Sequence, residues 1–286
     1  MRFLQSAFRV LITLVAVGVA GVLVVMLWQS YMLSPWTRDG RVQVQVVNVA
    51  SEVAGTVVDV PVRDNQFVHK NDVLFQVDPT RFHLAVAQAQ AALESAQNQL
   101  SFAQSESRRQ QRLTVYASEE AREKAENTMR VAQASLDQAQ VALDVAKLNL
   151  ARSTVISPVN GYVTHLRLRA GAYVNAGVAQ LAVVDSDSFW IEGYFEETKL
   201  ARIRVGDKAQ IRLMGEPVRL TGHVESIAAG IEDRDRGQGA NLLANVNPTF
   251  SWVRLAQRVP VRIALDHLPD RIALVAGRSA TVEITD

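Results

Sequence analysis

The sequence of 286 residues contains no cysteine. This absence excludes disulfide bonds, thiolate metal sites, cysteine nucleophiles and a lipid anchor attached through an N-terminal cysteine. Neither sign of charge is in clear excess, because 30 Lys and Arg oppose 29 Asp and Glu and leave a net charge of +1. A chain with this balance gives no electrostatic reason to expect a nucleic-acid partner.

Motifs of catalysis and of ligand binding are also missing. The sequence has no phosphate-binding glycine loop and no G-x-S-x-G motif. None of its five histidines stands at metal-ligand spacing from another histidine or from a carboxylate. Glu192, Glu196 and Glu197 are close in sequence, but carboxylates at the end of a strand are usually solvated. We therefore expect no enzymatic activity, no metal and no cofactor.

Proline and glycine are absent between Arg81 and Arg152, so nothing in the backbone interrupts a helix there. Apolar residues recur in two arms at alternating steps of three and four, which is the pattern of a coiled coil. Each arm has about 30 residues and would be about 45 Å long. We predict an antiparallel helical hairpin over residues 80–152. Its two seams are Val86, Ala89, Leu93, Ala96, Leu100 and Ala103, and Met129, Ala132, Leu136, Ala139, Leu143, Ala146 and Leu150.

The predicted tip of the hairpin lies between the two seams, within residues 104–128. A plain connection between helices needs only a few turn residues. An apolar run flanked by arginines at an exposed apex instead favours a docking surface. The predicted docking residues are Arg109, Arg112, Leu113, Tyr116 and Ser118.

One long apolar run is present near the N-terminus. Residues 10–28 carry no charge and are numerous enough to cross a membrane as a helix. Arg2 and Arg9 precede the run and no Lys or Arg follows until Arg38, so the positive-inside rule places residues 1–9 in the cytoplasm. The alternative is a cleaved signal peptide, whose apolar region is usually about 7–15 residues long. We predict an uncleaved anchor over residues 10–30. Its residues include Val10, Leu14, Val17, Leu23 and Trp28.

A repeat flanks the predicted hairpin. Each residue of the segment 51–77 stands 106 positions before its counterpart in the segment 157–183, without a gap. Apolar and polar residues alternate in both segments, as half-buried strands require, and Gly and Asn recur at predicted tight turns. Two such halves make a small β-sandwich that resembles the biotinyl/lipoyl fold. The turn glycines of the two halves are Gly55, Gly161, Gly171 and Gly177.

A carrier protein of the biotinyl/lipoyl fold bears a modified lysine at the tip between its halves. Here the tip is formed by residues 77–81, which include no lysine, and Lys70 lies in an earlier turn. The residue that would carry the chemistry is therefore missing, which disfavours an acyl or biotin carrier.

The last third of the sequence, from residue 186, consists of short alternating segments and turns, which predicts a small β-barrel. Residues 38–50 also alternate and are expected to pair with the late strands in a membrane-proximal part. The expected fold class is an elongated, multidomain α+β chain with an N-terminal transmembrane helix. The predicted segments are 1–9 (cytoplasmic), 10–30 (anchor), 38–50 (membrane-proximal strand), 51–79 and 153–185 (lipoyl-like halves), 80–152 (hairpin), 186–228 (barrel), 229–249 (mobile loop) and 250–286 (barrel return and membrane-proximal strands).

These features together resemble the HlyD/EmrA-type periplasmic adaptors, also called membrane fusion proteins. The resemblance covers essentially the whole chain, and segments 53–57, 64–68, 73–78 and 156–161 are similar to the paired half-motifs of that family. Three further segments, 34–41, 196–200 and 252–262, resemble the branch that serves efflux of aromatic carboxylic acids such as p-hydroxybenzoic acid.

The resemblance implies a role in a tripartite pump. In such a pump the chain bridges an inner-membrane transporter of the aromatic acid exporter type and a TolC-like channel in the outer membrane. It implies a ring of three or six copies, each with a single span in the bacterial inner membrane and its bulk in the periplasm. Family adaptors often carry Arg, then Leu four positions on, then Ser seven further on at the tip. Arg109 and Leu113 match this pattern, whereas Ser118 stands two positions early.

Two other functions stay open at the level of the sequence. One is an EmrA-like adaptor for multidrug efflux or secretion, because adaptors of this build serve drugs, toxins and acids alike. The other is a membrane-anchored coiled-coil scaffold that pairs with a different helical partner.

Overall fold

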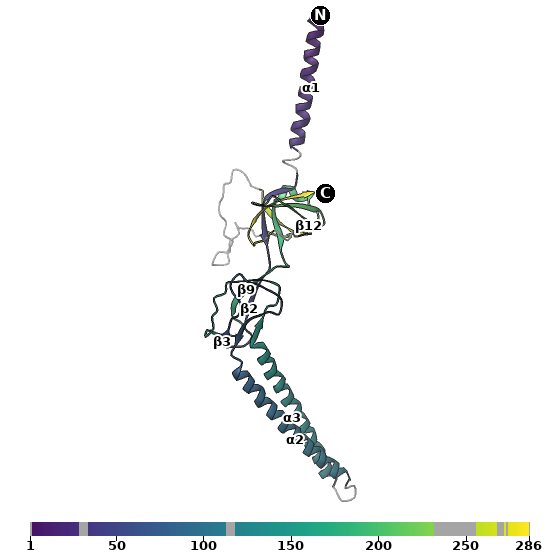
Figure 1. Cartoon of the computed structure of the whole chain (residues 1–286). Coiled ribbons are helices and arrows are strands. Elements are labelled where there is room, and N and C mark those ends of the chain that lie inside the picture. The colour runs from purple at the N-terminus through teal and green to yellow at the C-terminus, as the bar shows by residue number, and fades with distance from the viewer. Residues whose placement is uncertain are drawn as a thin grey trace, which may run out of the picture. The chain divides into compact units, whose positions relative to one another are not determined.

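The structure, a computed structural model of the whole chain, describes residues 2–28, 34–112, 118–231, 256–267, 272 and 274–285. In the first helix it describes side chains only at residues 13–26. The chain forms two compact units (Figure 1), of which one is Val46–Asp187 and the other combines Met1–Gln45 with Ser188–Asp286. The unit Val46–Asp187 is therefore inserted, along the sequence, between the two segments that form the other unit.

The unit Val46–Asp187 contains two four-stranded sheets, and each sheet combines strands from both halves of the sequence repeat. Leu74, Phe75, Val77, Val163 and Val183 are fully buried in its core. This arrangement confirms the predicted split sandwich. The first sheet has the order β2 (Val46–Ala50), β9 (Ala179–Asp185), β7 (Gly161–Thr164), β4 (Phe67–Val68), and the second has the order β6 (Thr154–Ile156), β5 (Val73–Val77), β3 (Gly55–Asp59), β8 (Tyr173–Val174).

The two halves of the sandwich exchange equivalent hydrogen bonds. Asn65 donates its backbone N–H to the carbonyl oxygen of Val163 over 2.8 Å. Gly171 is the repeat counterpart of Asn65, and it donates in the same way, over 2.8 Å, to Val57. Because Val57 is in turn the counterpart of Val163, the two bonds are related by the pseudo-twofold that the repeat predicts.

The four predicted turn glycines fall into two groups. Gly171 and Gly177 have φ of 89° and 78°, a conformation that glycine adopts without steric cost. Gly55 and Gly161 instead lie in strands β3 and β7 and do not have positive φ, which differs from the prediction. At Gly161 the reason for glycine is close approach, because a Cβ would lie 1.9 Å from the carbonyl oxygen of Val184.

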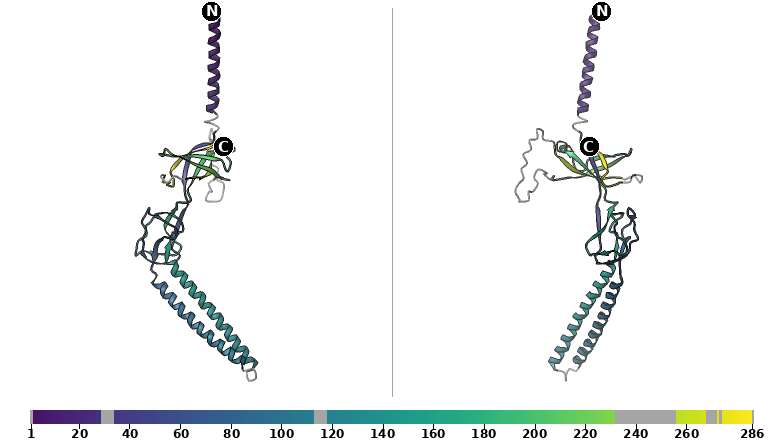
Figure 2. Two further views of the ribbon diagram at one scale, coloured as in Figure 1. Left: turned by 45° about the vertical axis from the view of Figure 1, so that its right-hand side comes forward. Right: turned by 90° about the vertical axis from the view of Figure 1, so that its left-hand side faces the viewer.

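The helical hairpin is inserted between the halves of the sandwich. It consists of α2 (Thr80–Arg112) and α3 (Glu119–Arg152), which run side by side in both views of Figure 2. Every residue of the two predicted seams is buried or half-buried, and Leu93 and Leu143 are only 5% and 2% exposed. The hairpin and its seams are therefore confirmed.

Local hydrogen bonds fix both ends of the hairpin at the sandwich. The carboxylate of Asp78 accepts the backbone N–H of Thr80 over 3.0 Å as α2 begins. This hydrogen bond, together with one from the Thr80 side chain, lowers the pKa of Asp78 below its ordinary value. At the other end, the buried hydroxyl of Ser153 donates to the carbonyl oxygen of Leu150 over 2.6 Å.

The second unit contains a closed six-stranded antiparallel barrel. Alternate residues of each strand point into an apolar core, in which Val42, Ile191, Phe195, Ile211 and Ile263 are fully buried. The predicted small barrel is thereby confirmed. Its strands have the order β1 (Trp36–Gln43), β10 (Trp190–Glu196), β13 (Arg258–Leu265), β12 (Arg219–Ile227), β11 (Lys208–Leu213), β14 (Ser279–Thr285), and β14 pairs with β1.

The segment 38–50, predicted as one membrane-proximal strand, is divided between the two units. Strand β1 pairs with β10 and β14 in the barrel, whereas β2 pairs with β9 in the sandwich. The late strand β14 is likewise a barrel strand. The alternation of the sequence correctly predicts a strand before residue 44 and another after residue 45. A period of two, however, does not tell which sheet a strand joins.

Helix α1 spans Arg2–Trp28. Among the residues that the structure describes, no helix has the length and apolar character needed to cross a membrane. The anchor expected over residues 10–30 is therefore not shown, and the side chains of Val10 and Trp28 lie outside the described ones. The predicted loop 229–249 also lies almost wholly outside the described residues.

Candidate functional site

The predicted docking surface at the hairpin tip is described in part. Arg109 and Arg112 are exposed in the last turn of α2, and Arg109 forms an ion pair with Glu106 one turn earlier. Leu113 and Tyr116 lie outside the described residues. Docking at the tip therefore stays a prediction.

Ser118 is the N-cap of α3. Its hydroxyl oxygen accepts the backbone N–H of Ala121 over 3.2 Å. Glu119 and Glu120 follow in the first turn, where negative charge is favourable near the helix N-terminus. This serine thus determines where the second arm of the hairpin begins.

A groove runs between the two helices near the tip, and we call it the hairpin groove. Phe102 of α2 and Val131 of α3 are 76% and 67% exposed at its rim. The groove consists of adjoining hollows of about 520 and 290 Å³. It is lined by Ser95, Asn98, Gln99, Phe102, Ala103, Glu106, Gln110, Ala121, Lys124, Ala125, Thr128, Val131, Ala132 and Ser135.

A second hollow lies on the barrel, and we call it the barrel cleft. It has a volume of about 430 Å³, within the range of small-molecule sites. Strands β1, β10 and β13 contribute to it, as does the short 3-10 helix η2 (Glu197–Arg202). The lining residues are Trp36, Thr37, Arg38, Asp39, Tyr194, Glu196, Lys199 and Arg258.

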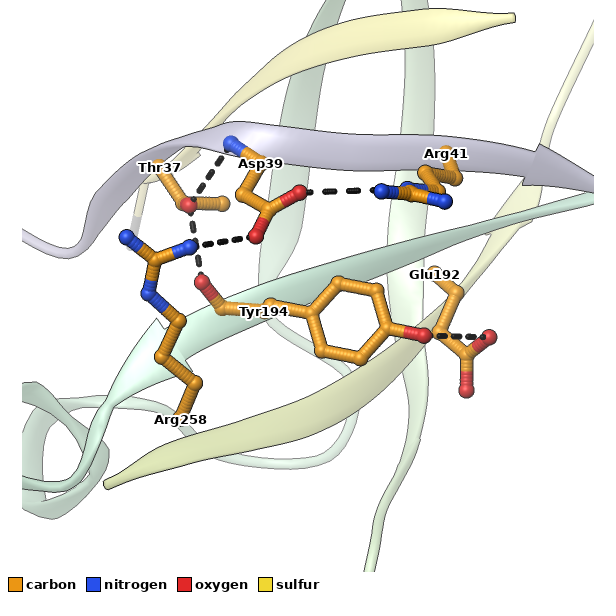
Figure 3. Close-up of polar contacts among 6 residues, drawn as sticks. All are labelled: Thr37, Asp39, Arg41, Glu192, Tyr194 and Arg258. Carbon is orange, nitrogen blue, oxygen red and sulfur yellow. Dashed lines mark hydrogen bonds and ion pairs between the residues drawn. The ribbon is translucent and has the colours of Figure 1, made fainter. Parts of the chain in front are cut away.

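Polar contacts join three strands at the barrel cleft (Figure 3). The buried hydroxyl of Thr37 donates to the carbonyl oxygen of Tyr194 over 2.8 Å and accepts the N–H of Asp39 over 3.1 Å. The carboxylate of Asp39 forms an ion pair with Arg258 of β13 and lies 3.9 Å from Arg41. Asp39 is therefore held in place from two sides.

The phenol of Tyr194 keeps its proton over a wider pH range than usual. Burial raises its pKa above the ordinary value, and the charge of Glu192 raises it further. The hydroxyl donates to the carboxylate of Glu192 over 3.3 Å, as Figure 3 shows. Tyr194 is thus a neutral hydrogen-bond donor at physiological pH.

The indole of Trp36 has two cations close to it. The guanidinium of Arg38 lies 5.4 Å from the ring centroid, and the ammonium of Lys199 lies 5.3 Å from it. These distances are within the range of cation–π attraction. Lys199 also lies 3.7 Å from the carboxylate of Glu196.

The sequence did not predict the barrel cleft. It indicated that Glu192, Glu196 and Glu197 are solvated strand-end carboxylates. Glu196 and Glu197 are indeed exposed, but Glu196 also lines the cleft, and the half-buried Glu192 accepts a hydrogen bond from the phenol of Tyr194. One sequence feature could have found the cleft. The segments 34–41, 196–200 and 252–262, which carry the resemblance to aromatic-acid adaptors, each contribute a lining residue.

The sequence analysis also missed two histidine–carboxylate pairs, of which one joins His69 to Asp72 over 3.7 Å. In the other, the Nδ1 atom of His223 lies 2.7 Å from the carboxylate of Asp266. Within the part of the chain that the structure describes, no group of three or more His, Asp or Glu residues could hold a metal ion.

Comparison with known proteins places this architecture in a family. Residues 45–186 match the family described as "RND MFP, barrel-sandwich hybrid domain", and residues 188–285 match the "AAEA-like beta-barrel domain". A protein of Escherichia coli (strain K12), described as "Uncharacterized protein YdhJ", is 41% identical over 259 residues, which are 90% of this chain and 91% of the relative. The chain belongs to the membrane fusion protein family. Membrane fusion proteins are the periplasmic adaptors of efflux systems, so this chain is one of them.

Solved structures of membrane fusion proteins share the fold. MacA from Actinobacillus actinomycetemcomitans aligns with a TM-score of 0.64 and 18% identity, over 88% of this chain and 79% of that chain. A membrane fusion protein from Streptococcus pneumoniae R6 aligns with a TM-score of 0.63 and 18% identity, over 88% of this chain and 99% of that chain. A MacA–MexA chimera that contains the Pseudomonas aeruginosa MexA α-hairpin aligns with a TM-score of 0.62 and 18% identity, over 88% of this chain and 81% of the chimera.

Proposed function

We propose that this membrane fusion protein is the adaptor of a tripartite pump that exports aromatic carboxylic acids such as p-hydroxybenzoate. It joins an inner-membrane transporter of the aromatic acid exporter type to a TolC-like channel in the outer membrane. Several copies, three or six, form a ring whose hairpins pack side by side. The chain makes and breaks no bond, because its role is to connect and to seal.

The observation that carries this proposal is the hairpin inserted between the halves of the sandwich. Its helices have 33 and 34 residues and are each about 50 Å long. A sandwich core does not require such an extension, and the apolar seam holds the two helices together along it. An extension of this length, whose first helix ends in the exposed residues Arg109 and Arg112, suits docking to a distant partner.

Helix α1 is the proposed single-pass anchor in the inner membrane, with the rest of the chain in the periplasm. Its described side chains between Leu14 and Met26 include nine large apolar residues that are 53 to 65% exposed. Apolar side chains exposed all around a helix are unfavourable in water and favourable in lipid.

Aromatic carboxylic acids are proposed as the cargo because of the barrel cleft. The three segments that resemble aromatic-acid adaptors lie apart in the sequence, yet each contributes to this one hollow. Its lining combines an aromatic ring with cations, which suits a ligand that is both aromatic and anionic.

The function is tested by export in cells. Deletion of the gene should sensitise cells to p-hydroxybenzoate, and a plasmid copy should restore tolerance. The variant Leu113→Asp should fail to restore tolerance at an unchanged protein level, because a buried charge at the tip would oppose docking. Growth in p-hydroxybenzoate, with protein level measured by immunoblot, is the readout.

A matched control is Leu84→Asp, since Leu84 is a 68% exposed leucine on the same hairpin but far from the tip in sequence. It should restore tolerance fully. Rescue by Leu113→Asp would contradict tip docking, and sensitivity of the deletion strain to unrelated drugs alone would favour a multidrug adaptor. Cross-linking from position 113 to a cell-wall or division protein in place of an outer-membrane channel would favour a scaffold.

A further inference from the structure

The charges that line the barrel cleft do not cancel. Asp39 forms an ion pair with Arg258, and Glu196 lies 3.7 Å from Lys199. Among the residues that the structure describes, no carboxylate forms an ion pair with Arg38, which is exposed. Among the described lining residues, three cations stand against two carboxylates, which leaves one positive charge, and Arg38 carries it.

The position of Arg38 makes its charge available beside an aromatic surface. Its guanidinium lies 5.4 Å from the ring centroid of Trp36. A guanidinium offers a planar fork of N–H donors that matches both oxygens of a carboxylate. The indole offers a flat apolar surface next to this fork, against which an aromatic ring can stack.

We propose that the barrel cleft binds a small aromatic monoanion, with its carboxylate on Arg38 and its ring against Trp36. The proposal rests on the proposed function for the identity of the ligand, which is the exported aromatic carboxylate. The adaptor is then more than a connector, because its barrel holds the cargo at a defined site.

The lining favours a carboxylate over a phosphate or an anionic membrane surface. Two of the three cations already have carboxylate partners, so the uncompensated charge equals that of one carboxylate. A dianionic phosphate would meet Asp39 and Glu196 as well and would be repelled by them. A volume of about 430 Å³ holds a benzoate-sized ligand.

The test uses the purified full chain in detergent micelles, titrated with p-hydroxybenzoate in a calorimeter. Saturable binding is expected, and the neutral analogue p-hydroxybenzamide should bind at least about tenfold more weakly because it lacks the charge. The variant Arg38→Gln should likewise lose about tenfold or more in affinity for p-hydroxybenzoate.

The matched control is Arg212→Gln. Arg212 is an exposed arginine of strand β11 in the same barrel, and it does not line the cleft. It should bind as the unchanged protein does. Equal binding by both variants would overturn the proposal, as would binding of inorganic phosphate or of phosphatidylglycerol vesicles as tight as that of p-hydroxybenzoate.

Tryptophan fluorescence locates the site independently of affinity. The chain has four tryptophans, and of the two whose side chains the structure describes, Trp36 lines the cleft and Trp190 does not. The variant Trp36→Phe keeps an aromatic ring, so it should still bind p-hydroxybenzoate while losing most of the fluorescence change. An undiminished fluorescence change in this variant would place the ligand elsewhere and overturn the proposal.

The cleft and the proposed function can fail separately. If the purified chain does not bind p-hydroxybenzoate but its gene still restores tolerance to it, the cleft proposal is overturned and the function stands. If the chain binds p-hydroxybenzoate through Arg38 but the deletion strain shows normal tolerance, the cleft proposal stands and the export function is contradicted.

Discussion

Ser118 shows how one side chain can serve local structure at a position that also suits docking. Its hydroxyl caps α3 over 3.2 Å to Ala121. Family adaptors often carry a serine near this position, and Ser118 comes two residues early. The cap offers a physical reason for this position, because the helix must begin where its first free N–H groups find an acceptor.

Capping and docking by Ser118 predict different results from two substitutions. Ser118→Ala should destabilise the start of α3 by about 1 kcal/mol, whereas Ser118→Asp should keep the cap because a carboxylate also accepts the N–H groups. Thermal unfolding followed by circular dichroism at 222 nm measures the cap. If Ser118→Asp restores stability but not tolerance to p-hydroxybenzoate, the hydroxyl has a second role at the tip. A melting curve of Ser118→Ala identical to that of the unchanged protein would refute the cap.

At the scale of elements, the hairpin is held by a narrow seam. Leu143 is 2% exposed in this seam, whereas Val145, two positions later on the same helix, is 52% exposed. Because a helix turns by about 100° per residue, neighbours two apart face different directions. We therefore expect the free energy of unfolding of the hairpin to depend on the residues of the seam and not on those of the outer face.

Substitution to alanine tests this dependence. Leu143→Ala should destabilise the hairpin by about 2 kcal/mol or more, since it removes buried methyl groups and leaves a void. Val145→Ala removes a similar apolar group from the surface and should change stability by less than about 0.5 kcal/mol. Urea unfolding followed at 222 nm gives both values. Equal losses at the two positions would mean that the outer face of α3 is packed as well.

The elements differ in how far the sequence reveals them. The seam and the repeat are predictable because their periods of three to four residues and their constant offset are local properties of the chain. The barrel cleft is not, because it depends on strand register across the closed barrel. Its bonds join Thr37 to Tyr194 and Asp39 to Arg258, which are 157 and 219 residues apart. No periodicity encodes contacts of that range.

At the scale of the whole molecule, the chain passes from one unit to the other at two junctions, and the first of them falls within an alternating segment. The segment 38–50 reads as one strand, yet β1 ends at Gln43 and β2 begins at Val46 in a different sheet. Both strands keep their buried faces on either side of this break. The sequence therefore shows that strands exist there, while the partners of each strand are decided by packing.

If the proposed ring forms, we expect the hairpin groove to be a contact between neighbouring copies. Phe102 is 76% exposed and Val131 is 67% exposed beside hollows between the helices. Water contact with a large aromatic ring is unfavourable, and a neighbouring hairpin would cover it. If a second copy packs here, Phe102 is at the centre of the contact between copies.

Sedimentation of the purified chain tests this contact. Phe102→Glu should shift the chain from oligomers towards monomers, because assembly would then bury an unpaired charge. Leu84→Glu is the control, since Leu84 is 68% exposed on the same helix but does not line the groove. The control should assemble normally, and both variants should keep the helical content of the unchanged protein, because neither residue is in the seam. Assembly that resists Phe102→Glu would show that the ring, if it forms, uses another face of the hairpin.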